Sequence, residues 1–444
     1  MPHFPANKTF HVATLGCKIN QYESEAIAEA WRGKGFAEAD DAAGAGVLLV
    51  NSCAVTGRAV SDLRALVRRL RLQNPAARIV VTGCAAQVLS AELSAMPEVD
   101  EVVPQDRKAA LLSGPLFAPA PPAAAAVPRG FPPFRIGSFR RARAVVKVQD
   151  GCSHHCTYCI VPLTRGGSVS RDPAEAVDEM RRLLDAGYRE LVLSGVNLRQ
   201  YGADLPQPLD FWDLLARVEA ELAPQWAGRA RLRLSSVEPG QLGAKALDVL
   251  GASRLVAPHL HLSLQSGDAA VLRRMGRGHY RPEQVREFLT QLARFWPRLG
   301  LGADLLTGFP GETEEQFENS YAFCRELPLT YAHVFPYSPR PGTAASRLAD
   351  PLPKAERTAR AARLRGMIEA KKRAFQKELA AQPRLTVLVE SADSGQGVCE
   401  FYAACRVESA PGVALRAGGL VRARPVEIAG GRIVCAALGE GAPA

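Results

Sequence analysis

The sequence predicts a multidomain α/β protein with an N-terminal parallel α/β domain, a central partial (β/α)6 barrel and a small C-terminal antiparallel β-barrel. Short apolar runs alternate with helical patterns over roughly the first three quarters of the chain, as in parallel sheets whose strands are joined by helices. Beyond a long basic helical pattern, short β-like runs separated by Gly and Pro take over. The predicted divisions are 1–113, a linker over 114–143, 144–379 and 380–444.

The composition is that of an ordinary globular protein of two to four domains. The chain has 444 residues, of which 47% are hydrophobic and 23% charged. No apolar run approaches the roughly 18 residues of a membrane-spanning helix, and no basic stretch followed by an apolar one stands at the N-terminus. Ten cysteines suit a reducing compartment, where thiols bind metals. We therefore expect a cytoplasmic protein with no membrane partner.

Three cysteines follow three predicted strands of the N-terminal domain. The strands are Phe10–Leu15, Val47–Asn51 and Ile79–Thr82, with helices predicted at 23–34 and 59–73, and the cysteines are Cys17, Cys53 and Cys84. Since ligands gather at the carboxyl ends of parallel strands, we expect these thiols to converge on one metal cluster. The alternative is that three small residues fill the turns between strands and helices.

A linker and six further strands come next. Residues 114–133 hold seven prolines and six alanines, which predicts a semi-extended connection. The six β/α units predict a partial barrel with its chemistry at the C-terminal ends of the strands. The predicted strands are Ala144–Gln149, Glu190–Ser194, Arg231–Ser235, His259–Leu264, Leu301–Leu306 and Tyr331–Tyr337.

A second group of cysteines begins just after the first strand of this barrel. Cys152, Cys156 and Cys159 have the spacing C-x3-C-x2-C. Three thiolates can hold three irons of a cubic cluster and leave the fourth iron open, whereas a ferredoxin closes its cluster with a fourth cysteine. A zinc site would need a fourth ligand, and His154 and His155 lie within the loop where they would have difficulty reaching the same metal. Structural cysteines are a further alternative, but the run forms no apolar stripe.

Positive charge is concentrated in two parts of the chain. The formal net charge is +10, and residues 340–384 and 1–145 contribute most of it. The helical pattern over 354–379 therefore predicts an RNA-binding surface, with a solvated helix face as the alternative. Residues 385–444 carry slightly more acidic than basic side chains. We thus expect phosphate contacts from the basic helix and from Arg64, Arg68, Arg69 and Arg71 rather than from the last barrel.

The cysteine spacing, with Tyr158 before the last cysteine, resembles that of the radical S-adenosylmethionine superfamily. Within it the whole chain is similar to the methylthiotransferases, which end in a barrel of the TRAM kind, and it looks most like their tRNA threonylcarbamoyladenosine subgroup. The motifs that carry this resemblance are Thr14–Glu23, Gly195–Leu198, Leu234–Pro239, His259–Gly267, Asp304–Thr313 and His333–Thr343.

The resemblance implies two [4Fe–4S] clusters and S-adenosylmethionine as cofactors. Cys152, Cys156 and Cys159 would hold the cluster that binds S-adenosylmethionine, and Cys17, Cys53 and Cys84 would hold an auxiliary cluster that delivers sulfur. A 5′-deoxyadenosyl radical would activate C2 of threonylcarbamoyladenosine beside the anticodon for methylthiolation. The polar strand-end residues that would contact S-adenosylmethionine are Gly195, Asn197, Ser235 and Gln265, residue types that are also common in turns.

The expected partners are a tRNA substrate and an electron donor such as flavodoxin or ferredoxin, with the chain as a monomer. No catalytic residue is predicted beyond the cluster ligands. Other substrates of the same chemistry are isopentenyladenosine in tRNA and an aspartate of a ribosomal protein. A non-catalytic iron–sulfur protein that binds RNA is the alternative of a different class.

Overall fold

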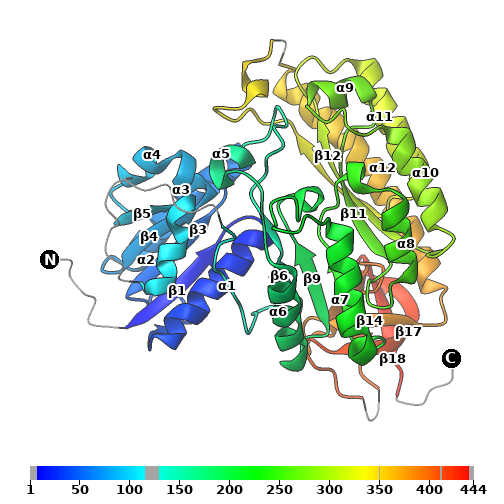
Figure 1. The fold of residues 1–444 in the computed structure, drawn as a ribbon, viewed down its shortest axis with the longest axis horizontal. Helices are drawn as coiled ribbons and strands as arrows, with labels where there is room; N and C mark the ends of the chain where they lie inside the picture. The colour runs from blue at the N-terminus through cyan, green and yellow to red at the C-terminus, as the bar shows by residue number, and fades with distance from the viewer. Residues whose placement is uncertain (1–7, 116–129, 350, 411–412, 440–444) are drawn as a thin grey trace.

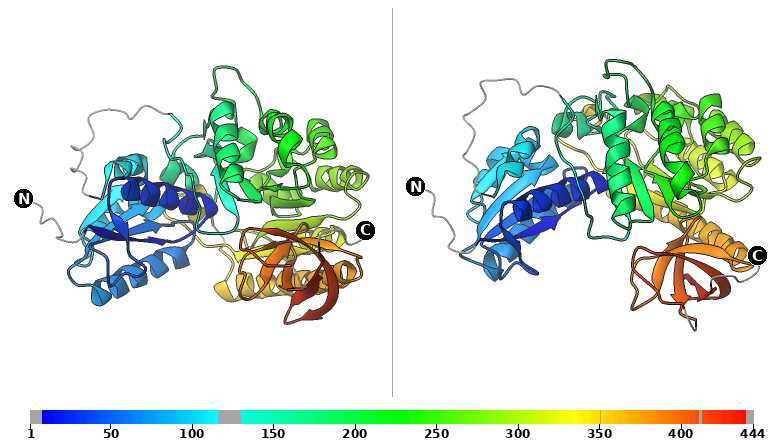
Figure 2. Two further views of the ribbon diagram at one scale, coloured as in Figure 1. Left: turned by 90° about the horizontal axis from the view of Figure 1, so that it is seen from below. Right: turned by 60° about the horizontal axis from the view of Figure 1, so that its bottom comes forward.

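The computed structural model describes residues 8–115, 130–349, 351–410 and 413–439, and Figure 1 shows three bodies along the chain. An N-terminal domain lies beside a curved central barrel, and a small closed barrel lies below it (Figures 1 and 2). The predicted fold class is confirmed, whereas the predicted division of the chain at particular residues stays a prediction. No helix in the described part of the chain is long and apolar enough to cross a membrane.

The N-terminal domain is a five-stranded parallel sheet in the order β2-β1-β3-β4-β5. Every residue of β3 is buried, because its alternate side chains enter different clusters: Val47 and Leu49 pack on the side of α1, and Leu48 and Val50 on the side of α2. The sequence missed the short edge strands β2 and β5. The elements are β1 (Thr9–Thr14), α1 (Lys18–Gly33), β2 (Ala37–Glu38), β3 (Val47–Ser52), α2 (Gly57–Gln73), β4 (Arg78–Gly83), α3 (Cys84–Val88), α4 (Ser90–Ser94), β5 (Glu101–Pro104) and η1 (Gln105–Ser113).

The central barrel is formed by two three-stranded parallel sheets. Val237 joins them, because its N–H donates to His261 O at 2.7 Å and its carbonyl accepts from Ser263 N at 3.0 Å. All six predicted strands are present: β6 (Ala144–Lys147), β9 (Glu190–Ser194), β10 (Arg231–Leu234), β11 (His259–Gln265), β12 (Gly300–Thr307) and β13 (Tyr331–Pro336).

Helices cover the outer face of this barrel (Figure 1). Thr313 caps α11 as the sequence suggests, since its hydroxyl accepts from Gln316 N at 3.2 Å. The helices are α5 (Val161–Arg165), α6 (Pro173–Asp185), α7 (Phe211–Trp226), α8 (Ala244–Ala252), α9 (Ala269–Arg274), α10 (Pro282–Leu292) and α11 (Glu314–Glu326). Short elements near the cysteine loop are β7 (Gln149–Asp150), β8 (Val169–Ser170), η2 (Leu198–Gln200), η3 (Pro239–Gln241) and η4 (Ala344–Arg347).

The helix α12 (Lys354–Ala380) leads into a closed five-stranded barrel. Its pairs are antiparallel except β16 with β18, which is parallel. Cys399, Cys405 and Cys435 are buried in its core, consistent with a packing role. The strands are β14 (Leu385–Val389), β15 (Gln396–Cys399), β16 (Ala404–Glu408), β17 (Leu420–Ala429) and β18 (Arg432–Ala437), of which β15 was missed from the sequence.

A buried cluster of charges fixes this barrel to the central one. Glu190 on β9 forms ion pairs with Arg231 and Arg233 on β10. The two guanidinium groups then reach across the boundary, where Arg231 donates to Thr386 O at 2.7 Å and Arg233 to Cys399 O at 2.6 Å. Burial raises the pKa of Glu190, but the arginines outweigh it and lower the pKa to about 2. The carboxylate therefore stays charged and the small barrel has a defined position.

The described end of the predicted linker packs against both neighbouring bodies. Phe134 and Ile136 are buried in the main hydrophobic cluster. The hydroxyl of Tyr22 on α1 donates to Phe134 O at 2.7 Å, and Ile136 N donates to Glu179 on α6 at 3.0 Å. Residues 130–143 thus form an ordered connection rather than a loose one, while residues 116–129 lie outside the described part of the chain.

Candidate functional site

The structure brings the three N-terminal cysteines together. Cys17 precedes α1, Cys53 follows β3 and Cys84 begins α3, so all three stand at the same edge of the sheet. Burial raises the pKa of Cys53 to about 11, and the charges of Cys84 and Cys17 add to this shift. Gly16 has a φ of 97°, and a Cβ there would lie 2.7 Å from Cys53 Cβ, so only glycine permits this approach.

Arg340 lies close to Cys53 and has no anionic partner among the described residues. The residue is 7% exposed, and its Nε has no hydrogen-bond partner among the described residues. Burial lowers the pKa of Arg340, whereas Cys53 opposes that shift. A buried cation is costly unless an anion accompanies it. Three thiolates carrying an iron–sulfur cluster would supply that anion, so Arg340 fits a cluster at this place.

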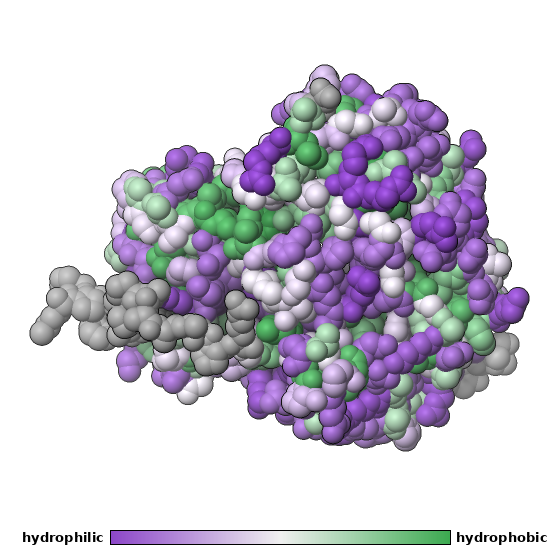
Figure 3. Space-filling model, turned by 45° about the horizontal axis from the view of Figure 1, so that its top comes forward, coloured by the Kyte–Doolittle hydropathy of each residue, from purple (hydrophilic) through white to green (hydrophobic). Residues whose placement is uncertain are grey.

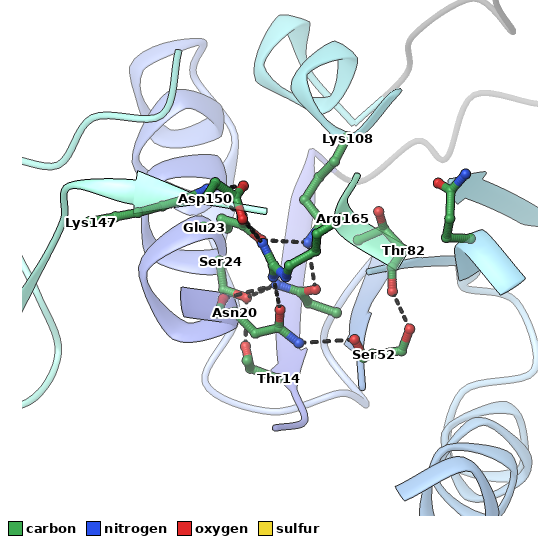
Figure 4. A network of polar contacts seen from close by, with 12 residues as sticks. Thr14, Asn20, Glu23, Ser24, Ser52, Thr82, Lys108, Lys147, Asp150 and Arg165 are labelled. Atoms are coloured by element: carbon green, nitrogen blue, oxygen red, sulfur yellow. Dashed lines mark hydrogen bonds and ion pairs between the residues drawn. The ribbon is translucent and has the colours of Figure 1, made fainter. Parts of the chain in front are cut away.

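A network of buried charges holds the N-terminal domain on the barrel (Figure 4). Glu23 on α1 bonds to Lys108 of η1 at 2.6 Å and to Lys147 of β6 at 2.7 Å. Arg165 of α5 bonds to Glu23 at 2.9 Å and to Asp150 at 2.8 Å, and Lys147 bonds to Asp150 at 2.6 Å.

This network carries three cations and two carboxylates, and its side chains are at most 5% exposed. Burial raises the pKa of Glu23, but Arg165, Lys108 and Lys147 more than offset it and hold the pKa well below its usual range. Cys84 lies close enough to this network to act in the direction of a higher pKa on both Arg165 and Lys108. The network therefore fixes the first group of thiols relative to the barrel and leaves one excess positive charge beside it.

The second group of thiols lies in a loop between β7 and α5 that several backbone contacts hold in place. Thr157 N donates to Met275 O at 3.0 Å, and its carbonyl accepts from Ala345 N at 2.7 Å. Gly151 has a φ of 65°, and a Cβ there would lie 2.0 Å from Gly167 O. Backbone contacts therefore hold the loop that carries Cys152, Cys156 and Cys159 in one conformation.

Two side chains donate hydrogen bonds to sulfurs of this loop. Asn197 Nδ2 lies 3.6 Å from Cys152 Sγ, and Arg277 Nη1 lies 3.8 Å from Cys156 Sγ. Glu238 holds the guanidinium of Arg277 at 2.8 Å and also contacts His279 at 2.6 Å. Hydrogen bonds to sulfur are one of the means by which proteins set the reduction potential of an iron–sulfur cluster. The sequence missed Arg277 because its partner Glu238 is 39 residues away.

The donor sets fit cubic clusters better than single ions. A zinc ion with tetrahedral thiolates needs sulfurs only about 3.8 Å apart. Among the described residues, neither group of three thiols has its sulfurs all within 4.8 Å of one another. Burial raises the pKa of Cys159 to about 12, so iron would displace protons from these thiols on binding. The assignment of the six cysteines as ligands stays a prediction that this geometry supports.

The four residues predicted to contact S-adenosylmethionine lie at the carboxyl ends of β9, β10 and β11. Gly195 faces Gln149, and a Cβ there would lie 3.0 Å from it. Asn197 contacts Cys152, as described above. Ser235 Oγ is buried without a hydrogen-bond partner among the described residues, which suits a ligand, and Gln265 has an unusual positive φ of 64°. Their role stays a prediction.

A cavity with about 90 Å³ of space open to a water molecule lies inside the barrel between all three bodies. Residues at alternating positions of β11 and β13 face it, and Lys18 and Tyr402 complete it from the two flanking bodies. Several of these residues lie in the sequence motifs named above, but nothing in the sequence predicted a cavity that they share. The lining residues are Lys18, Arg143, Val192, Arg233, Leu234, Ser236, His259, His261, Asp304, Tyr331, His333 and Tyr402.

The helix α12 is not the free basic surface that the sequence predicts. Arg360 is buried and bonds to Glu312 at 2.9 Å, and Arg363 bonds to Glu314 at 2.8 Å. Lys371 donates to a backbone carbonyl. Of the four arginines predicted to contact phosphate from α2, Arg64, Arg68 and Arg71 have acidic partners. Most of the proposed phosphate contacts are therefore engaged within the protein.

Comparison with known proteins identifies the family. Residues 9–104 match the family model described as uncharacterized protein family UPF0004, and residues 146–324 match the radical SAM superfamily. The threonylcarbamoyladenosine tRNA methylthiotransferase of Bacillus subtilis is 39% identical over 78% of this chain and 76% of that protein. The chain belongs to the radical S-adenosylmethionine methylthiotransferase family. The threonylcarbamoyladenosine tRNA methylthiotransferase of Aquifex aeolicus is 32% identical over 85% of this chain and 92% of that protein.

This methylthiotransferase-family chain is also similar to a relative named for another substrate and to a solved structure. The tRNA-2-methylthio-N(6)-dimethylallyladenosine synthase of Dehalococcoides mccartyi is 35% identical over 79% of this chain and 80% of that protein. Among solved structures, the radical S-adenosylmethionine methyltransferase TsrM from Kitasatospora setae aligns with a TM-score of 0.55 and 16% identity, covering 77% of each chain. The second similarity supports the fold alone.

Replacing Arg340 with Met is expected to weaken iron binding at Cys17, Cys53 and Cys84. The change removes the unpaired buried cation beside Cys53, whereas the apolar stem of Met keeps the packing. We expect anaerobically reconstituted Arg340→Met to lose iron to a chelator faster than the unchanged protein. Arg347→Met, seven residues further on, is the control. Equal rates of iron loss would show that Arg340 does not stabilise a cluster.

Proposed function

We propose that this chain methylthiolates C2 of N6-threonylcarbamoyladenosine next to the anticodon of tRNA. The observation that carries the proposal is the buried network around Glu23, which holds one group of three thiols against the barrel that bears the other. A reaction that joins radical formation to sulfur delivery requires both cluster sites to reach one substrate, since reacting groups must come within about 3–3.5 Å. A non-catalytic RNA-binding protein would need no such arrangement.

The cavity favours threonylcarbamoyladenosine over isopentenyladenosine. An isopentenyl group is apolar and suits an apolar pocket, whereas this cavity is lined by Lys18, two arginines, three histidines and two tyrosines. Relatives named for either substrate are of similar identity to this chain. The polar lining therefore supports the first substrate independently of the names.

The proposed cofactors are two [4Fe–4S] clusters and S-adenosylmethionine, which when bound supply electron transfer, a carbon-centred radical and sulfur. Cys152, Cys156 and Cys159 would hold one cluster, and Cys17, Cys53 and Cys84 the other. The protein's own contribution is positional. Asn197 and Arg277 donate hydrogen bonds toward sulfur, Arg340 balances charge, and Ser235 presents a free hydroxyl.

The tRNA would also contact a basic surface shared by α12 and the last barrel. Arg373 and Lys377 on α12 and Arg422 and Arg424 on β17 are exposed and have no ion-pair partner among the described residues. These elements pack side by side (Figure 2). The proposal also includes an electron donor such as flavodoxin or ferredoxin, a monomeric state and a cytoplasmic location. The hydrophobic surface along the N-terminal domain near its seam with the barrel is a candidate contact for that donor (Figure 3).

Mass analysis of tRNA nucleosides tests the function. Cells lacking the gene are expected to lose the methylthio group from threonylcarbamoyladenosine and to retain the unmethylthiolated nucleoside. The purified protein, reconstituted with iron and sulfide and supplied with reductant and S-adenosylmethionine, should restore it on tRNA from those cells. Loss of the group from isopentenyladenosine instead would select the other substrate. Full iron loading with no cleavage of S-adenosylmethionine would favour the non-catalytic alternative.

A further inference from the structure

The cavity inside the barrel has walls from three parts of the chain. The central barrel contributes the side chains of β11, β12 and β13, among them His261 and Asp304. The N-terminal domain contributes Lys18, which follows the predicted cluster ligand Cys17 directly. The last barrel contributes Tyr402, whose ring stacks on His259 at 4.6 Å between centroids. A group held here would therefore lie beside the first residue of α1 and close to the N-terminal thiols.

The cavity has a surplus of positive charge that its own residues do not neutralise. Arg233 is paired with Glu190, and Arg143 bonds to Glu390 at 2.8 Å. Lys18 has no hydrogen bond or ion pair in the part of the chain that the structure describes, and burial lowers the pKa of its ammonium group although Tyr402 and Asp304 oppose that shift.

Among the described residues that line the cavity, Asp304 alone is acidic, and its carboxylate already has two histidine partners. Its carboxylate contacts His261 at 3.1 Å and His333 at 3.2 Å. Burial raises the pKa of Asp304, but hydrogen bonds from the two histidines bring it well below the usual range. An incoming anion would thus meet a compensated carboxylate and an unpaired ammonium.

The surroundings of Tyr402 also favour negative charge in the cavity. Burial alone would raise the pKa of its phenol, yet Arg143, Lys18 and Arg233 together bring it below the usual value. Arg143 and Arg233 also lie over the ring, 5.3 and 5.1 Å from its centroid. The interior of the cavity therefore favours negative charge, which an apolar substituent could not supply.

We propose that this cavity is the specificity pocket for the N6 substituent of the substrate base, and that Lys18, assisted by Arg143, binds its carboxylate. The inference rests on the proposed function and assigns the part of the substrate that these residues recognise. The threonylcarbamoyl group ends in a carboxylate and a hydroxyl, which Lys18 and the tyrosine and histidine side chains can pair. A prenyl group would leave the lysine desolvated and unpaired, so the pocket rejects it.

The test measures binding of three anticodon stem–loops that differ only at one adenosine. One carries the threonylcarbamoyl group, one its uncharged carboxamide analogue and one the isopentenyl group. The reconstituted wild-type protein is expected to bind the carboxylate form about 10- to 100-fold more tightly than the carboxamide, the range for a partly buried hydrogen bond to a charged group. Equal affinities for acid and amide would overturn the proposal without any substitution.

Variants then assign the preference to Lys18. Lys18→Met should abolish the preference for the acid over the amide, and Lys18→Arg should keep most of it. Lys34→Met, at the other end of α1, is the matched control and should leave it unchanged. Iron content is measured for each variant, because Lys18 adjoins Cys17. A Lys18→Met protein with full iron and an undiminished preference would overturn the assignment.

Failure of this inference and failure of the proposed function give different results. If threonylcarbamoyladenosine is methylthiolated but the acid and the amide bind equally, the proposed function holds and the assignment of the pocket to the carboxylate is wrong. If only isopentenyladenosine is methylthiolated, the proposed substrate itself is wrong.

Discussion

Alanine at Cys152, Cys156 and Cys159 together is expected to abolish reductive cleavage of S-adenosylmethionine and to remove about four of eight irons per chain. The loop around these residues is fixed by backbone contacts to Met275 and Ala345, so it should keep its shape without the thiols. Iron analysis after anaerobic reconstitution and quantification of 5′-deoxyadenosine measure the two effects. The loss should be complete because no described side chain nearby can replace three thiolates.

The reciprocal triple variant separates the roles of the two groups. Alanine at Cys17, Cys53 and Cys84 should also remove about four irons but leave cleavage of S-adenosylmethionine intact while methylthiolation stops. Cys324→Ala, a buried cysteine outside both groups, should change neither quantity. The assignment of roles fails if both triple variants cleave S-adenosylmethionine equally well.

Replacing Glu23 with Gln is expected to destabilise the protein by about 3–5 kcal/mol, the cost of breaking a buried ion pair from one side. The change removes the acidic partner of Lys108 and leaves Lys147 and Arg165 to share the single carboxylate of Asp150. The free energy of unfolding, measured in urea at pH 7, checks the prediction. Glu92→Gln removes an ion pair whose side chains are 42% and 58% exposed and should cost no more than about 1 kcal/mol. Similar losses for both variants would contradict the role of the network.

The pH dependence of this effect has a definite sign. Because the folded protein holds the pKa of Glu23 well below its usual range, the stabilisation is present above the unfolded value of about 4.3 and is lost as pH falls below it. The stability difference between wild type and Glu23→Gln should thus be full at pH 7 and shrink in acid. A difference that grew on acidification would rule out this explanation.

Local patterns predicted most of the fold, because apolar runs and turn residues identify strands with little help from distant contacts. The six barrel strands and the strand-end positions of Cys17, Cys53 and Cys84 follow from such patterns. Strand β15 was missed since it is only four residues long and contains Gly397. That glycine is needed because a Cβ would lie 2.0 Å from Leu388 O on the neighbouring strand, a contact that the sequence does not reveal.

Charge was harder to interpret from the sequence than apolarity, because a charged residue's role depends on its partner. Arg360 and Arg363 looked like free cations, but Glu312 and Glu314, which pair with them just before and at the start of α11, lie more than 40 residues earlier. Glu23 and Arg165 are 142 residues apart, so nothing local indicated that they join two bodies. The Pro/Ala-rich segment suggested loose tethering, whereas buried ion pairs fix the domain.

Tyr402 forms one wall of the central cavity, although it follows both groups of cysteines and all six strands of the central barrel in the sequence. A chain shortened before Tyr402 would keep both sets of thiols but would lack this wall of the cavity. The C-terminal barrel thus contributes to the shape of the cavity, in addition to any contact it makes with RNA.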